Sequence, residues 1–278
     1  MNFLLQPFHY EFFTRAIVVS IMAGFLCGVM GVYITTRRMS YIAHGLSHAI
    51  LGGAVLSYVL GLNFYIGSGT WGFATALLIQ YLTGRRLYSD AAIGIVTTAS
   101  FALGVAIIST HHGFAQNFEA ALFGNVLGIS QVDLWTVAAV TVVLLILVFV
   151  FYRPLLFWCF DREVAKVHGV PIFFMDTLFA LMLATLLVAT LQVLGVTLVI
   201  SAVIIPPSIA RLLTNQFGKI IIISAILGSI ISFAGIYLSY YFDIASGASI
   251  VLISTLIFGL VLLFTFFKNR RKPNLASF

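Results

Sequence analysis

The sequence predicts an all-α membrane protein whose helices cross the bilayer several times. Of its 278 residues, 62% are hydrophobic and only 8% are charged, and the mean hydropathy is +1.13. Soluble domains carry about 25% charged residues. Apolar runs of about 20 residues recur along the chain, which is the length that a helix needs to cross a hydrocarbon core. Barrel strands would instead give alternating segments of about 10 residues.

We predict nine membrane spans from these apolar runs, and the sequence shows no separate soluble domain or linker, so 1–278 is expected to form a single transmembrane domain. An alternative with eight spans remains open if 173–212 folds differently. The predicted spans are approximately 14–35, 40–60, 64–83, 91–110, 133–152, 173–192, 194–212, 219–240 and 248–267.

The basic residues predict the orientation of these spans. If the connector after the fifth span is cytoplasmic, all Lys and Arg residues except Arg15 lie on or beside the cytoplasmic side. The positive-inside rule then places the N-terminus outside and the C-terminus in the cytoplasm. The cytoplasmic set is Arg37, Arg38, Arg85, Arg86, Arg153, Arg162, Lys166, Arg211, Lys219, Lys268, Arg270, Arg271 and Lys272.

Composition also argues against several other classes of protein. The net charge of +6 comes from small groups of cations at the ends of apolar runs, so it does not indicate nucleic-acid binding. Cys27 lies in an apolar run and Cys159 in a polar connector, so neither a disulfide framework nor a thiolate metal site is expected. Residues 1–13 lack a basic region and a small-residue cleavage site, so we expect no cleaved signal peptide.

Three local patterns refine the order of elements. Gly24 and Gly28 form a GxxxG pattern, which we interpret as a close helix–helix contact. The segment Phe118–Gly128 is too short and polar to span, so we expect an interfacial or re-entrant helix on the outer side. Pro206 and Pro207 interrupt the seventh apolar run, and we expect them to kink or end that helix.

The connector between the fifth and sixth spans predicts a short charged helix outside the bilayer. Asp161 is a suitable N-cap, Glu163 lies in the first turn, and Gly169 with Pro171 would end the helix. An ordinary solvated loop is the alternative. The chain has no GxxxxGK[ST] loop to bind phosphates, so work driven by ATP would need another subunit, and this helix could be its docking point.

Two histidines in the second span are the main candidate functional residues. His44 and His48 are four residues apart, so a helix places both on one face. Ionisable groups within a membrane usually mark a functional site. A single buried histidine is more often just hydrogen-bonded, but the pair lies beside the small residues Gly45, Ala49 and Gly52. Hydrolysis is not expected, because Gly45 stands where a zinc protease helix has Glu.

Six stretches together resemble the membrane permease subunits of bacterial ABC importers for manganese, zinc or iron. They occur in the family's order and cover essentially the whole chain. The stretches are Met39–Gly53, Asp90–Ile95 with Phe101–Val105, Leu122–Gly128, Phe160–Asp161 with Gly169–Pro171, Leu191–Ile200 running on to Pro206, and Ser246–Leu252.

The resemblance implies a type II-like permease fold of about eight to nine transmembrane helices with a cytoplasmic coupling helix. It implies a homodimer or heterodimer of permeases with the translocation path between them, two cytoplasmic ATPase subunits, and an extracytoplasmic protein that delivers the metal. The ATPases would engage the 161–169 helix, through Asp161, Arg162, Glu163, Lys166 and Gly169. The metal path would contain His48, which matches the family's Gly-Asp-Ala-Leu-Ser-His motif, and His44, which replaces its acid.

Several other polar residues are weaker candidates for contact with the ion. Gln192 could line the path or bond between helices. His111, His112, Glu119 and Asp243 could receive metal or contact the binding protein on the outer side, although solvation is the simpler interpretation of each. Asp133 could likewise attract cations or pair with the binding protein, and solvation is again the simpler interpretation. Asp90 and Asp176 lie near cytoplasmic helix starts, where acids complement the helix dipole.

The resulting hypothesis is a transport subunit, not an enzyme, that forms the path for Mn²⁺ or Zn²⁺, with iron also possible. The ion is cargo, and no permanently bound cofactor is expected. Imidazole suits zinc and iron, and carboxylates suit manganese, so the exchange of an acid for His44 weakens the hold on a hard cation. Two rivals remain: an ABC permease for a metal chelate, and a proton-coupled secondary carrier, which would usually need acids in mid-membrane.

Overall fold

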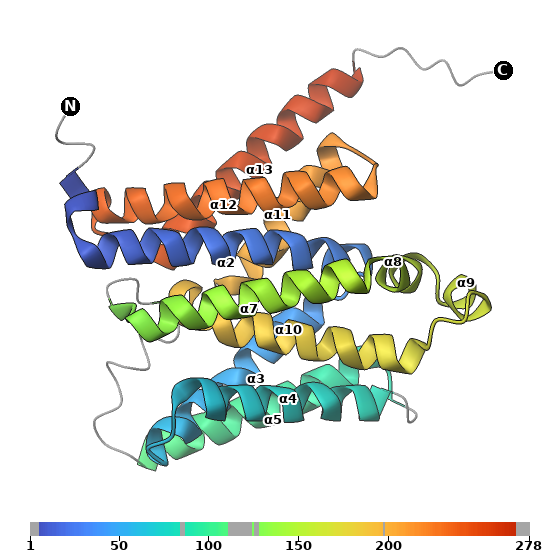
Figure 1. Ribbon diagram of the computed structural model, residues 1–278, viewed down its shortest axis with the longest axis horizontal. Helices are drawn as coiled ribbons and strands as arrows, with labels where there is room; N and C mark the ends of the chain where they lie inside the picture. Colours follow the sequence, from blue (N-terminus) through green and yellow to red (C-terminus); the bar gives the residue numbers. More distant parts are fainter. Residues whose placement is uncertain (1–5, 84–86, 111–123, 125–127, 197, 271–278) are drawn as a thin grey trace.

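In the computed structural model the chain is a bundle of helices lying side by side (Figure 1). The structure describes residues 6–83, 87–110, 124, 128–196 and 198–270. The longer helices are α2 (Glu11–Thr36), α3 (Ser40–Val59), α4 (Phe64–Thr83), α5 (Ser89–Thr110), α7 (Gln131–Val150), α10 (Ile172–Leu194), α12 (Phe217–Phe242) and α13 (Ser246–Arg270). The shorter ones are η1 (Gln6–His9), α8 (Tyr152–Phe160), α9 (Arg162–Val167) and α11 (Val199–Leu213).

Each predicted span coincides with a helix, which confirms the all-α membrane fold. Within the described ranges, seven helices are long and apolar enough to cross a membrane: α2, α3, α5, α7, α10, α12 and α13. The other two predicted spans are α4, which has 20 residues and is not among the seven, and α11, which has 15. At 1.5 Å per residue α11 is about 22 Å long, shorter than the hydrocarbon core.

The expectation that Pro206 and Pro207 could end a helix is wrong. Helix α11 contains both prolines and continues to Leu213. Pro207 has no N–H for the carbonyl of Val203, and that carbonyl lies directly against Gly31 of α2. Close packing by a neighbouring helix is one way in which membrane helices tolerate proline.

The GxxxG pattern of α2 packs against α12, as interpreted from the sequence. A side chain at Gly24 or Gly28 would collide with the backbone of Gly228 or Ser224. The Ser224 hydroxyl donates to the Gly28 carbonyl at 2.7 Å. Figure 1 shows the two helices lying along each other. This contact fixes α2, whose final residues lead directly into α3.

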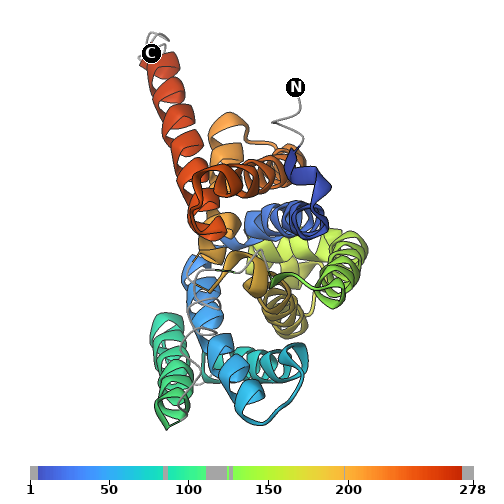
Figure 2. The same cartoon turned by 90° about the vertical axis from the view of Figure 1, so that its left-hand side faces the viewer.

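Helix α10 lies at the centre of the bundle and contacts α2, α3, α4 and α7. Its second half is almost entirely buried. Figure 2 shows α5 and α7 on opposite sides of the molecule, and it shows α13 projecting away from the other helices. The exposed residues of α13 are mainly Leu and Phe, which is expected for a surface that faces lipid or another chain.

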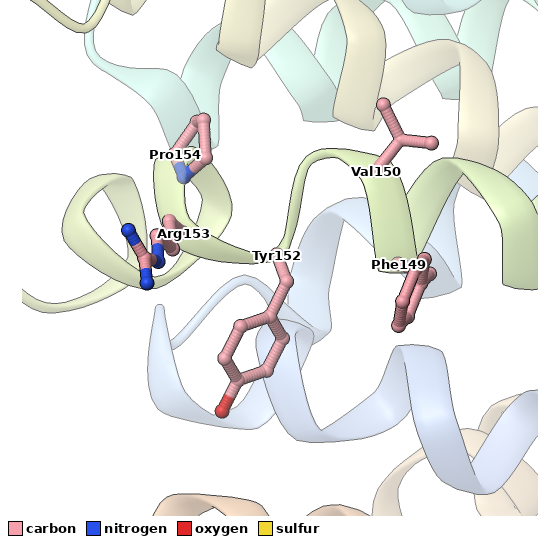
Figure 3. Close-up of a pocket in the computed structure, with 5 residues that line it drawn as sticks. All are labelled: Phe149, Val150, Tyr152, Arg153 and Pro154. Atoms are coloured by element: carbon pink, nitrogen blue, oxygen red, sulfur yellow. The ribbon is translucent and has the colours of Figure 1, made fainter.

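A sharp junction separates α7 from α8 (Figure 3). If α7 continued, Pro154 could not donate to the carbonyl four residues earlier. In the first turn of a new helix the missing N–H has no consequence, and α8 begins at Tyr152. Phe149, Val150 and Arg153 line a surface groove at this junction. The turn carries α8 and α9 to one end of the bundle, here called the α9 end; the opposite one is the η1 end (Figure 1).

Candidate functional site

The two histidines of α3 lie together on the surface of the chain. Their ring centroids are 4.8 Å apart and the rings are nearly perpendicular, at 79°. His44 is exposed and His48 is half-buried, with its ring against the edge of Phe101 of α5 at 5.5 Å. The i, i+4 spacing therefore brings both imidazoles to one patch, which reaches the border between α3 and α5.

Small residues position this patch by bringing α5 close to α3. A side chain at Gly45 would meet Ile93 and Thr97, and Gly52 lies against Ser100 and Gly104. The Ser100 hydroxyl also donates to the carbonyl of Ala49 at 3.0 Å. The glycines thus let α5 cover one face of α3, and the histidines lie at the edge of this helix–helix contact.

The pair offers two nitrogen donors to a metal ion. No group of three or more His, Cys, Asp and Glu residues that could hold a metal occurs in the part of the chain that the structure describes. Transition-metal sites in proteins usually have at least four ligands. The described residues therefore supply only part of the coordination shell of an ion at His44 and His48.

Gln192 belongs to a hydrogen-bonded group at the η1 end of the bundle. Its side-chain amide lies 3.3 Å from the Tyr65 hydroxyl, which donates to the Asp133 carboxylate at 2.6 Å. The other carboxylate oxygen of Asp133 accepts from the Ser130 amide and hydroxyl, at 2.8 and 2.7 Å. The group joins α4, α7 and α10, so the geometry shows Gln192 bonding between helices; its role in the path stays a prediction.

The expectation that Asp133 is solvated is wrong, because its residue is only 7% exposed. Three donors and the N-terminus of α7 compensate its charge, as buried carboxylates require. The sequence signal was available: Ser130 and Asp133 form a capping box at the start of α7. Tyr65 could not be found in this way, because its partner is 68 residues further along the chain.

The predicted connector helix is present as α9. The Asp161 side chain caps it by accepting from the amides of Glu163 and Val164 at 2.8 and 3.2 Å. Lys166 pairs with Glu163 at 2.7 Å, and Gly169 ends the segment in a left-handed conformation with φ of 73°. Its role in coupling to an ATPase remains a prediction.

A charged cluster at the α9 end was not found from the sequence. The Asp176 carboxylate of α10 accepts from the Trp158 indole of α8 at 2.8 Å and from Arg162 of α9 at 2.9 and 3.1 Å. Arg37, the C-cap of α2, lies 3.7 Å from the same carboxylate. Asp176 was interpreted only as complementing a helix dipole, and the structure shows that it also joins three other elements.

Among the described residues, the remaining candidate Asp243 belongs to α12 and not to the histidine pair on α3. His111, His112 and Glu119 lie outside the described residues, as does most of the segment Phe118–Gly128. Asp243 is the exposed C-cap of α12, and its backbone is left-handed with φ of 52°. Asp and Asn tolerate this conformation better than most residues, which gives Asp243 a local structural reason to be there.

Comparison with known proteins agrees with this fold. The chain is 39% identical over 264 residues to the manganese transport system membrane protein MntC of Halalkalibacterium halodurans, covering 95% of this chain and 90% of that protein. It is 36% identical over 266 residues to a probable iron transport system membrane protein of Haemophilus influenzae, covering 95% and 94%.

A solved structure extends the agreement to three dimensions. A chain of PsaBC from Streptococcus pneumoniae, solved in complex with Fab, has a TM-score of 0.84 and 32% sequence identity, and the match covers 93% of this chain and 92% of that one. The model of the family described as the ABC 3 transport family matches residues 9–265, nearly the whole helical bundle. The chain therefore belongs to the ABC 3 transport family.

Proposed function

We propose that this chain is the membrane permease subunit of an ATP-driven importer for divalent transition-metal ions. The observation that carries the proposal is the pair of exposed His44 and half-buried His48, with ring centroids 4.8 Å apart on a membrane helix. Neutral imidazole is a common metal ligand, and an ionisable pair at membrane depth is costly unless it has a use. Relatives over almost the whole chain are named as manganese and iron transport proteins, which supports metal as the cargo.

The path would lie between two permease subunits, either two copies of this chain or this chain and a related one. One chain supplies two imidazoles, and a facing copy would supply two more. Four nitrogen donors satisfy a tetrahedral ion such as Zn²⁺, and fewer donors together with water suit an ion that must leave again. The apolar, largely exposed α13 shows that much of this chain's surface is suited to lipid or to another membrane subunit.

ATP would be hydrolysed by separate subunits that dock at the α9 end. The segment around α9 presents exposed apolar residues on a charged helix: Val167 is 85% exposed and Phe160 is 62% exposed. Because apolar surface outside the bilayer needs a cover, these residues suit a protein partner. Asp161, Arg162, Glu163, Lys166 and Gly169 form the helix and its ends, and would transmit the movement of the partner.

The same end of the bundle would face the cytoplasm. Arg37, Arg38, Arg153 and Arg162 lie there, whereas Arg15 lies in the first turns of α2 at the η1 end. This distribution agrees with the positive-inside rule and supports a cytoplasmic position for the end of α13. The protein would thus reside in the bacterial cytoplasmic membrane, and an extracytoplasmic binding protein would deliver metal to the η1 side.

The donor set bears on which ion is carried. Two imidazoles favour borderline ions such as Zn²⁺ and Fe²⁺, whereas Mn²⁺ prefers oxygen ligands. The names of the relatives favour manganese, so Mn²⁺ and Zn²⁺ are the two cargoes to compare first. The ion passes through the protein as its substrate, and no resident cofactor is needed for the transport cycle.

ATP-dependent uptake of Mn²⁺, Zn²⁺ and Fe²⁺ into vesicles that hold the assembled complex tests this proposal. We expect uptake of the free ion, and we expect this uptake to require both ATP and the ATPase subunits. Uptake that persists without the ATPases would instead show a secondary carrier. ATP hydrolysis that is stimulated only by a chelated metal would show a chelate permease.

A further inference from the structure

At the α9 end, two arginine side chains lie beside a single carboxylate, so the positive charge there exceeds the negative charge. Arg162 donates two hydrogen bonds to the Asp176 carboxylate, at 2.9 and 3.1 Å. The Arg37 guanidinium lies 3.7 Å from an oxygen of the same carboxylate. A carboxylate can accept several hydrogen bonds, but its single charge pairs fully with only one cation. The two arginines therefore share one partner unequally, and Arg162 has the better geometry.

The two arginines differ in how freely they can move. The side chain of Arg162 is 52% exposed and belongs to α9, whereas that of Arg37 is 13% exposed. Arg37 donates to the Trp158 carbonyl at 2.7 Å, and its guanidinium lies 4.1 Å from the centre of the Trp158 ring. Burial, followed by the nearby Arg162 charge, lowers the pKa of Arg37. Arg37 is thus a partly desolvated cation in an ion pair with Asp176, and the 3.7 Å separation is too long for a hydrogen bond.

Arg37 is directly connected to the helix that carries the histidines. Only Arg37, Arg38 and Met39 separate α2 from α3, and His44 lies just over one turn into α3. Arg38 is left-handed, with φ of 58°, a conformation that is unfavourable for a residue with a side chain. Because this connection is short and strained, a displacement of Arg37 should also displace the start of α3.

We infer that Arg37 and Arg162 compete for Asp176, and that exchange of this ion pair couples movement of α9 to the position of His44 and His48. When a partner pulls α9 away, Asp176 loses Arg162 and takes Arg37, which shifts the start of α3. When α9 returns, Arg162 recovers the carboxylate. Arg37, Arg162 and Asp176 are positioning residues, because none of them touches the ion. The inference rests on the proposed function for its physiological meaning, but its geometry can be tested separately.

The first test measures ions transported per ATP hydrolysed in vesicles that hold the complete complex, with Mn²⁺ and Zn²⁺ as cargo. Asp176→Asn should lower this ratio at least tenfold while hydrolysis stays within about threefold of the wild type. Asp176→Glu, which keeps the charge, should recover much of the ratio. Asp90→Asn is the matched control, because Asp90 is an exposed acid at the start of α5. An unchanged ratio in Asp176→Asn would overturn the inference.

A second variant covers the case in which Asp176→Asn does not assemble. Arg162→Gln alters a half-exposed side chain on the surface helix, so it should preserve the fold. It should leave Asp176 permanently with Arg37 and lower the ratio to a similar extent. A ratio within twofold of the wild type in Arg162→Gln would contradict the exchange.

A labelling experiment separates this inference from the proposed function, because it needs no cargo. His44→Cys places a thiol at an exposed position of α3, and the native Cys27 and Cys159 are buried. Adding ATP to the complex should change the labelling rate of this thiol at least threefold, and the change should disappear in the Asp176→Asn background. A response to ATP in this variant, together with no metal uptake by the wild-type complex, would contradict the proposed function and retain the coupling. If ATP still changed the labelling rate in the Asp176→Asn background, the inferred coupling would be contradicted.

Discussion

The carbonyl oxygen of Val203 in α11 lies where a side chain on Gly31 of α2 would have to be. Pro207 leaves this carbonyl without its usual helical donor, and the bare backbone of Gly31 is what lets it approach α2. The contact explains how a helix with two internal prolines remains packed. It also joins α11 to α2, the helix whose C-cap is Arg37.

Gly31→Ala should therefore destabilise the protein strongly. The added methyl group would overlap the Val203 carbonyl, and neither backbone can move without disturbing the α2–α12 contact, so we expect a loss of about 1–3 kcal/mol as in other overpacked cores. The midpoint of thermal unfolding in detergent measures the effect. Gly259→Ala on α13 is the matched control, because nothing lies within 4 Å of its added methyl group. Equal midpoints for Gly31→Ala and Gly259→Ala would contradict the contact.

Tyr65→Phe should loosen the η1 end of the bundle. The change removes the 2.6 Å donor to the buried Asp133 carboxylate and leaves one oxygen without its partner. A hydrogen bond to a charged group contributes about 1.5–3 kcal/mol, so a clear drop in thermal stability is expected. Tyr88→Phe, at an exposed position, provides a surface comparison. An Asp133→Asn variant should lower stability through the same group, so the double variant should cost less than the sum of the two.

The Cys159 thiol should give stability a distinctive dependence on pH. Burial raises its pKa to about 11, against the lowering effects of Arg37, a hydrogen bond with Thr36, and Arg211. In the unfolded chain the pKa is about 8.5, so the neutral buried thiol stabilises the fold fully below that pH, and the contribution falls as pH rises towards 11. The difference in unfolding midpoint between the wild type and Cys159→Ala should shrink from pH 7.5 to pH 10.5. A constant difference would show that the thiol does not titrate this way.

Much of the fold could be predicted from the sequence, because membrane helices are recognised by the length and apolarity of their segments. Every predicted span is a helix, and the Asp161 cap predicted α9 because capping depends on adjacent residues. Of the two outcomes expected for Pro206 and Pro207, a kink or the end of the helix, the second is wrong, and the neighbouring Gly31 of α2 is distant in sequence. Asp133 was misplaced for a similar reason, since its burial depends on Tyr65.

The candidate functional residues also fall into two groups: those that local sequence predicts and those that depend on tertiary packing. His44 and His48 could be found because helical periodicity alone puts them together. The cluster of Arg37, Trp158 and Asp176 could not, because it joins residues up to 139 positions apart through tertiary packing. The histidines are thus a local feature of α3, whereas the connection between α3 and α9 is a property of the folded bundle.

The central claim is that this chain carries metal ions past the His44 and His48 pair at the expense of ATP. The most direct measurement is ATP-dependent uptake of Mn²⁺ and Zn²⁺ into vesicles that hold the complete complex, with wild type, His44→Ala and His48→Ala compared at equal protein levels. We expect rapid uptake by the wild type and at least a tenfold loss for His48→Ala, with a loss for His44→Ala as well. Uptake by both variants at the wild-type rate would contradict it.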